Sequence, residues 1–177
     1  VAYADEGVEL RKNNITLPIM VMNPAEETFD TLLQHRLDPE VYNFRILQNL
    51  AHFLQDRHCR IHIKIDTGMH RLGFDRSEID ALITLLLACP NMKVASIFSH
   101  LAGADEKEHD NFSREQGRRF IDMADAISQR LSYRPIYHLL NSSGVLRFPD
   151  LQFDMVRLGI GLYGVNPTGE RDKLRPV

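Results

Sequence analysis

The chain has 177 residues, enough for one ordinary domain with a sizeable hydrophobic core. Hydrophobic residues make up 44% of the chain and charged residues 25%, a balance typical of a globular domain. The formal net charge is −3 and both signs are well represented, so no basic surface indicates binding to nucleic acid or to an anionic membrane. No apolar run approaches the roughly 20 residues that a membrane span needs, and no signal-peptide pattern opens the chain.

Cysteine usage gives no sign of a metal centre or a disulfide framework. Cys59 and Cys89 lie far apart without CxxC or Cys/His ligand spacing, so we interpret them as thiols in a reducing cytoplasm. Asp105 and His109 lie at i and i+4 and could mimic metal ligands, but no third ligand accompanies them. We therefore expect a solvated helix face there and no metal site.

Short β-rich runs alternate with helical stretches along the whole chain. The expected strands, in chain order, are Val1–Ala4, Pro18–Asn23, Val41–Phe44, Arg60–Ile65, Lys93–His100, Ile136–Ser142 and Met155–Tyr163. Helical spacing lies between them, at Ile46, Leu50 and Phe53, at Ile79, Leu82, Ile83 and Leu86 behind an expected N-cap at Ser77, and at Phe120, Ala124, Ile127 and Leu131. This alternation predicts parallel strands joined by right-handed crossovers.

Two α/β architectures accommodate this pattern: an open doubly wound sheet, or a (β/α)8 TIM-type barrel that lacks a strand. No GxGxxG turn favours a dinucleotide-binding sheet. A complete barrel takes about 250 residues, so a barrel without its first βα unit fits the length. Val1–Ala4 resembles the end of a strand already under way, and no terminating pattern closes the chain. We therefore expect an incomplete (β/α)8 barrel, with about seven of eight strands, as one partial domain over residues 1–177.

The strands carry a polar face that calls for an explanation. In the strand Arg60–Ile65, isoleucines alternate with His62 and Lys64, and in Met155–Tyr163 apolar residues alternate with Arg157 and glycines. Inward-pointing Lys and Arg are costly unless they are paired or bind something. One interpretation is internal salt bridges, such as Lys64 with Asp66 or Asp154. The other is an anion-binding site at the carboxyl ends of the strands, where barrel active sites lie.

Two loops favour the anion-binding site. Residues Asn141–Gly144 follow a strand with small side chains and hydroxyls, so their backbone N–H groups could approach a phosphate closely. Gly159 and Gly161 allow close backbone approach within the last expected strand, where interior glycine otherwise costs stability. Together the two loops predict a phosphate-binding cup.

Four ordered motifs are specific to one family. They are KIDTGMHRLGF (64–74), SHLAGAD (99–105), HLLNS with LRFPD (138–142 and 146–150) and VRLGIGLYG (156–164). The first closely resembles the KxDTGMxRxG signature of alanine racemases, and the order and spacing of the others agree with that family over essentially the whole chain. The chain thus resembles the N-terminal barrel of a bacterial alanine racemase, an isomerase that uses pyridoxal 5′-phosphate (PLP).

The resemblance implies roles for particular residues. Arg157 would face the pyridine nitrogen of PLP, and His100 would lie against the ring and hydrogen-bond towards Arg157. The phosphate would be held by Ser142 and the backbone of Gly159 and Ile160, with Asn141 in the same cofactor-binding set.

The resemblance also implies that Arg71, His100 and Lys64 are the catalytic residues of this chain and that Arg71 binds the substrate. Arg71 would contact the phenolic oxygen of PLP and the substrate carboxylate. Lys64 would carry a carbamate that fixes Arg71, because an amine crowded by arginine is more readily neutral and able to react with CO2. An ammonium bound to Asp66 is the alternative.

The family's two catalytic bases have no counterpart here. The PLP-binding lysine would precede Val1, and the opposing tyrosine would lie in a C-terminal β-domain after Val177, acting across a homodimer interface. The resemblance therefore implies that the parent cytoplasmic enzyme interconverts L- and D-alanine for the bacterial cell wall, and that this fragment alone is inactive.

Other classes remain open. A phosphate-binding barrel lyase or aldolase could use Lys64 as its Schiff-base residue, and a non-catalytic module could derive from the same barrel. Serine racemases share these motifs, so the amino-acid substrate is open as well.

Overall fold

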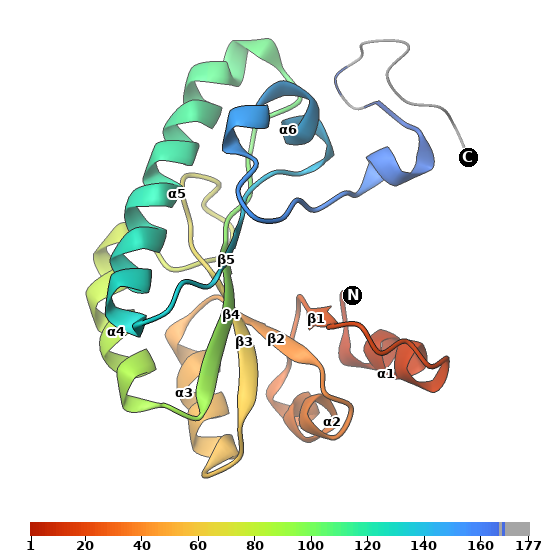
Figure 1. Ribbon diagram of the computed structural model, residues 1–177, viewed down its shortest axis with the longest axis vertical. Coiled ribbons are helices and arrows are strands. Elements are labelled where there is room, and N and C mark those ends of the chain that lie inside the picture. The colour runs from red at the N-terminus through yellow and green to blue at the C-terminus, as the bar shows by residue number, and fades with distance from the viewer. Residues whose placement is uncertain (167, 169–177) are drawn as a thin grey trace.

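Five parallel strands form one sheet whose spatial order, β1-β2-β3-β4-β5, follows the sequence (Figure 1). The computed structural model describes residues 1–166 and 168. The strands are β1 (Met20–Val21), β2 (Asp38–Val41), β3 (Cys59–Lys64), β4 (Met92–Phe98) and β5 (Ile136–His138), and every neighbouring pair is parallel. The α-helices are α1 (Ala4–Lys12), α2 (Phe29–Gln34), α3 (Phe44–Leu54), α4 (Ile79–Ala88), α5 (Asp110–Leu131) and α6 (Ser142–Arg147). The expected α/β class and parallel pairing are confirmed.

Helices α3, α4 and α5 follow one face of the sheet (Figure 1). Ile61 and Ile63 of β3 and the following Ile65 are fully buried in the core shared with these helices, as the strand alternation predicts. Asn43 starts α3 by accepting the Ile46 amide at 2.9 Å, a side-chain N-cap. None of the helices in the described part of the chain is both long and apolar enough to cross a membrane.

The expected cap of α4 is wrong. A 3₁₀ turn over Arg76–Glu78 precedes α4, and Asp75 begins that turn by accepting the amides of Ser77 at 2.8 Å and Glu78 at 3.2 Å. A carboxylate accepts two amide hydrogens better than the smaller serine hydroxyl, so the helical turn starts earlier than Ser77.

The second strand begins before its expected start at Val41. Asp38 and Glu40 make the segment look like a turn in sequence, yet β2 covers Asp38–Val41 and all four residues are buried. These two carboxylates point to the face of the sheet that also carries His62 and Lys64, and they pair with those side chains. The ion pairs of Glu40 with Lys64 and of Asp38 with Arg60, at 3.1 and 3.4 Å, together with the contact of Asp38 with His62, allow residues that usually disfavour strands to form a buried one.

Two expected strands are absent from the described residues. Val1 and Ala2 accept hydrogen bonds from Met22 and Asn23 at 3.0 Å, but helix α1 begins at Ala4. The segment expected as strand Met155–Tyr163 makes one bridge, His138 to Met155, and then turns into a 3₁₀ helix over Ile160–Tyr163. Leu158, Ile160 and Leu162 are 48–60% exposed, so no apolar face holds this segment flat against the sheet.

Candidate active site

A cavity of about 310 Å³ lies beyond the carboxyl ends of β4 and β5. Its lining consists of His100, Asn141, Ser142, Ser143, Arg157, Leu158, Gly159 and Ile160. The structure therefore brings together in one cavity the six residues of the expected cofactor-binding set, whereas Arg71, expected at the phenolic oxygen of the cofactor, does not line this cavity.

Arg157 is the cation of this cavity, and the strand ends hold it in place. Its guanidinium donates to Nδ1 of His138 at 2.7 Å and to the Ser99 carbonyl at 2.6 Å, and it lies 3.3 Å from Nδ1 of His100. Because a guanidinium only donates, both imidazoles must accept through Nδ1 and therefore carry their proton on Nε2. Burial lowers the pKa of Arg157 to about 10, so the group stays charged at neutral pH.

The two histidines next to Arg157 are neutral. Burial, followed by the charge of Arg157, lowers the pKa of His138 to about 2. The same two causes, with smaller contributions from Arg71 and Lys64, lower the pKa of His100 to about 4. The cavity thus combines one fixed cation with an imidazole that does not take up a proton near neutral pH.

A buried chain of polar contacts runs from Arg157 along the inward face of the sheet, from β5 to β2. His138 Nε2 lies 2.8 Å from Ser96 Oγ, which lies 2.6 Å from His62 Nδ1, and His62 Nε2 faces Asp38 at 3.6 Å. Since His138 carries its proton on Nε2, it donates to Ser96, and the serine hydroxyl in turn donates to His62. The sequence motifs indicate no role for His138, Ser96 or Asp38, although each lies on the inward face of its strand.

Ser142 joins the two loops expected to form a phosphate-binding cup. Its Oγ accepts the amides of Gly159 at 2.9 Å and Gly161 at 3.2 Å, which leaves its own hydroxyl proton free to donate into the cavity. Asn141 has a local role as well: its Oδ1 accepts the Gly144 amide at 2.9 Å and caps α6.

Lys64 lies on the inward face of β3 and pairs with Glu40, not with Asp66 or Asp154. Nζ is 3.1 Å from Glu40 Oε1, and both side chains are almost completely buried. The ammonium also lies 5.4 Å from the centre of the Phe98 ring, over which Arg157 is placed at 5.1 Å. Phe98 therefore contacts both cations and also stacks on His138, with the two ring centres 4.7 Å apart. Neither Phe98 nor Glu40 was identified from the sequence.

The loop after β3 holds Arg71 above the strand ends. Asp66 Oδ1 accepts the amides of Gly68 at 2.8 Å and His70 at 3.1 Å. The chain then comes back beside β3, where Phe74 forms a β-bridge with Ile65. The side chain of Asp66 is thus occupied within the loop. Arg71 is exposed, and its charge reaches both Glu40 and His100, whose pKa values it lowers.

Gln116 of α5 ties the strand-end loops together. Its Nε2 donates to the His100 carbonyl at 3.0 Å and to Thr67 Oγ1 at 3.2 Å, and its Oε1 accepts the Ala102 amide at 2.9 Å. A buried glutamine in a long amphipathic helix was a signal that sequence analysis did not use.

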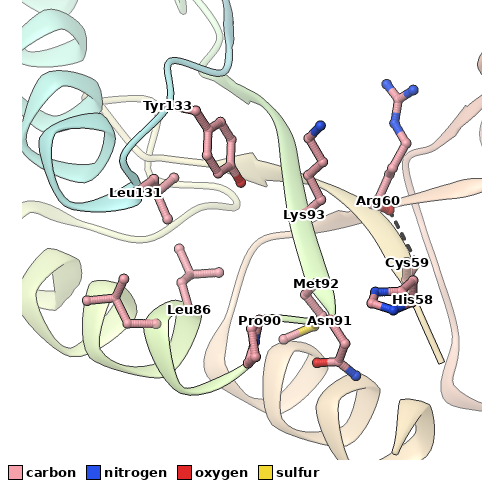
Figure 2. A pocket seen from close by; sticks show the side chains of 11 residues that line it. His58, Cys59, Arg60, Leu86, Pro90, Asn91, Met92, Lys93, Leu131 and Tyr133 are labelled. Carbon is pink, nitrogen blue, oxygen red and sulfur yellow. Dashed lines mark hydrogen bonds between the residues drawn. The ribbon is translucent and has the colours of Figure 1, made fainter. Parts of the chain in front are cut away.

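A second cavity, of about 530 Å³, lies at the opposite ends of the strands (Figure 2). Apolar residues of α4, such as Leu86, face the start of β4 at Met92, and Arg60, Lys93 and Tyr133 line the same space. It contains none of the residues expected to be functional, so the cavity around Arg157 is the candidate active site.

Comparisons with known proteins agree with this assignment. The family model for the alanine racemase N-terminal domain matches residues 1–167. The chain belongs to the alanine racemase family. An alanine racemase of Clostridium tetani is 33% identical over 100% of this chain and 48% of its own length, and one of Prochlorococcus marinus is 38% identical over 94% and 45%. The chain thus spans about half the length of the alanine racemases that it matches.

Solved alanine racemases share the fold. The Clostridium difficile enzyme, in complex with cycloserine, superposes with a TM-score of 0.90 at 31% identity, covering 99% of this chain and 50% of that one. The Corynebacterium glutamicum enzyme gives 0.87 at 30% identity, with 99% and 50% covered. The expected family and the TIM-barrel class are confirmed, with five strands in the described residues where about seven were expected.

Proposed function

We propose that the polypeptide carrying this chain interconverts L- and D-alanine with PLP, and that this chain supplies the cradle for the cofactor. The observation that carries the proposal is the fixing of Arg157 inside a cavity that also contains His100, Ser142 and Gly159. Two of the similar solved alanine racemases are described with cycloserine and with L-Ala-P, which are small amino-acid-like molecules.

The donor set fits PLP. A phosphate needs several donors. The Ser142 hydroxyl is free to donate at one end of the cavity, and the amides of Gly159 and Gly161, which donate to Ser142 Oγ here, are placed to donate to a phosphate in exchange. A pyridine nitrogen can accept a hydrogen bond from Arg157 at the other end. The volume of about 310 Å³ lies at the lower limit of typical ligand pockets, which hold about 300–1,000 Å³.

PLP, when bound, supplies the electron-withdrawing ring that makes the Cα proton of an amino acid acidic. Arg157 keeps its own protons at a pKa of about 10, so it hydrogen-bonds to the pyridine nitrogen without protonating it. His100 stays neutral and can pack against the ring without adding positive charge. These residues thus restrict how strongly the ring withdraws electrons, which favours return of the proton over side reactions.

Arg71 is proposed to bind the substrate carboxylate. It is exposed at the end of a loop that Asp66 fixes, and a guanidinium matches a carboxylate in a bidentate, charge-assisted pair. The Lys64–Glu40 ion pair lies close enough to Arg71 for the charge of Arg71 to lower the pKa of Glu40.

Further parts of the proposal rest on the family alone. Racemisation needs a base on each face of the substrate, and we propose that a lysine and a tyrosine outside residues 1–177 provide them, the tyrosine from a C-terminal β-domain of a homodimer. We further propose that residues 1–177 are part of the PLP-binding barrel domain of a bacterial cytoplasmic enzyme that supplies D-alanine for the cell wall.

The test uses the complete polypeptide as its gene encodes it, incubated with L-alanine and PLP in deuterated water. The expected result is loss of circular dichroism together with deuterium at Cα of both enantiomers. Arg71→Lys should reduce kcat/KM for alanine, whereas Arg45→Lys, an exposed arginine on α3, should not. Retention of the Cα proton in the wild-type reaction would contradict the proposal.

The lyase or aldolase alternative predicts a Schiff base on Lys64. The ion pair with Glu40 and the absence of Lys64 from the cavity lining argue against it. Borohydride trapping of a carbonyl substrate on Lys64 without PLP would establish that alternative instead.

A further inference from the structure

Glu40 is a buried carboxylate that the established motifs do not explain. It is 0% exposed, and Oε1 lies 3.1 Å from Lys64 Nζ. Apart from this contact with Lys64, neither carboxylate oxygen has a hydrogen-bond donor among the described residues. An ionised carboxylate without hydrogen bonds is costly to bury unless nearby charge compensates it.

The compensating charge comes from three sides. Burial is the largest influence on Glu40 and raises its pKa, while the charges of Lys64, Arg157 and Arg71 all lower it. Glu40 is therefore paired directly with Lys64 and is influenced at longer range by the charges of Arg157 and Arg71. Its position on β2, next to β3, places it behind the strand end from which Arg71 projects.

Lys64 has two neighbours that favour a positive charge. The Glu40 carboxylate forms an ion pair with the Lys64 ammonium. The Phe98 ring, centred 5.4 Å from Nζ, makes a cation–π contact with the same ammonium. Carbamate formation requires the opposite state. A neutral amine must attack the carbon of CO2, forming a C–N bond while one C=O bond opens to an oxyanion and the nitrogen releases a proton.

The product of that reaction would conflict with Glu40. Carbamylation would replace the positive charge of Lys64 by a negative one, about 3 Å from a carboxylate that has no other directed donor. Two anions at such a distance in a buried site repel strongly, so one of them has to be neutralised.

We propose that Glu40 is the resident anion of this active site, keeping Lys64 as an uncarbamylated ammonium and taking over the electrostatic support of Arg71. The inference deepens the proposed function, on which the role towards Arg71 rests. The carbamate that the family resemblance implies for Lys64 is then replaced by a carboxylate contributed by the neighbouring strand. Glu40 is a positioning residue, since it acts through Lys64 and the arginines.

The experiment is carbon NMR of the complete polypeptide in buffer with isotopically labelled bicarbonate, near neutral and at mildly alkaline pH. The wild type should show no carbamate carbon signal on Lys64. Glu40→Ala should show one, because the amine loses its counter-ion and lies among positive charges. Lys64→Arg in the Glu40→Ala background should remove the signal again. Glu40→Gln repeats the test with a side chain of nearly the same shape, in case the alanine variant does not fold.

Each outcome decides the proposal. A carbamate signal in the wild type that disappears in Lys64→Arg would overturn it. Absence of the signal from a folded Glu40→Ala or Glu40→Gln protein would also overturn it, since something other than Glu40 would then exclude CO2. Racemase activity is measured separately, so an inactive protein with the expected NMR result would reject the proposed function alone.

Discussion

Arg157 donates to the carbonyls of Ser99, His138 and Leu139 and to two imidazole nitrogens. A lysine could not reproduce this planar set of contacts, because its three donors radiate from one point. The guanidinium therefore serves two purposes: it completes the hydrogen bonding of the strand ends, and it presents a fixed cation to the cavity.

Arg157→Ala should weaken binding of PLP by about 1.5–3 kcal/mol, the range for a hydrogen bond to a charged group. This corresponds to roughly one to two orders of magnitude in Kd. Titration calorimetry of the complete polypeptide, with Arg45→Ala on the exposed side of α3 as the matched control, measures the effect. Equal affinity of the two variants would mean that Arg157 does not contact the cofactor.

The histidines predict how stability depends on pH. The folded-state pKa of His138 is lowered from 6.5 to about 2 and that of His100 from 6.5 to about 4. Below pH 6.5 the unfolded chain takes up protons that the folded chain does not, so the free energy of unfolding falls as the pH drops from 6.5 towards 4. His138→Gln removes one of these groups, so denaturant unfolding across this range should show a shallower decrease. An unchanged slope would contradict the buried, neutral state of His138.

At the scale of single elements, the loop after β3 shows how backbone geometry fixes a functional side chain. Gly73 has a φ of +126°, and a Cβ at this position would lie 2.7 Å from the backbone of Ile65 and Asp66. Both contacts would be with backbone atoms, which cannot move aside as the end of a flexible side chain can. The loop returns to β3 only because residue 73 has no side chain, and this return fixes the position of Arg71.

Gly73→Ala should therefore lower the free energy of unfolding by about 1–3 kcal/mol, the usual cost of a strained backbone position. It should also raise KM for alanine more than it lowers kcat, because Arg71 is displaced while the cavity around Arg157 stays intact. Urea unfolding and steady-state kinetics measure the two effects. A fully stable Gly73→Ala protein would show that the loop does not need this close approach.

Comparison of individual strands shows what sequence patterns can predict. The alternation in β3 was reliable because its isoleucines face helices and its polar residues face other polar residues. β2 was placed too late because Asp38 and Glu40 are acceptable in a buried strand only with His62 and Lys64 beside them, and those partners are distant in sequence. The same reason explains why motifs located the cavity around Arg157 but not Glu40, Ser96 or His138: their roles depend on cross-strand neighbours.

At the scale of the whole molecule, the cavity proposed to bind the cofactor has no lysine among its lining residues. Residues 1–177 expressed alone should therefore bind PLP reversibly and should not racemise alanine faster than free PLP. Equilibrium dialysis followed by circular dichroism of L-alanine provides the measurement. Activity should return when the remainder of the polypeptide is supplied, and racemisation by the isolated segment would show that both bases lie within it.

The consecutive order of the five strands has a consequence for synthesis on the ribosome. Each strand can pair with its predecessor as soon as it emerges, so the sheet can grow from β1 to β5 while the chain is still being made. The carbonyls of Ser99 and Leu139 receive the guanidinium only after residue 157 has left the exit tunnel. Until then these carbonyls and Nδ1 of His138 must be satisfied by water. The nascent sheet therefore forms with water at the carboxyl ends of β4 and β5. Arg157 replaces that water when it donates to the carbonyls and to His138.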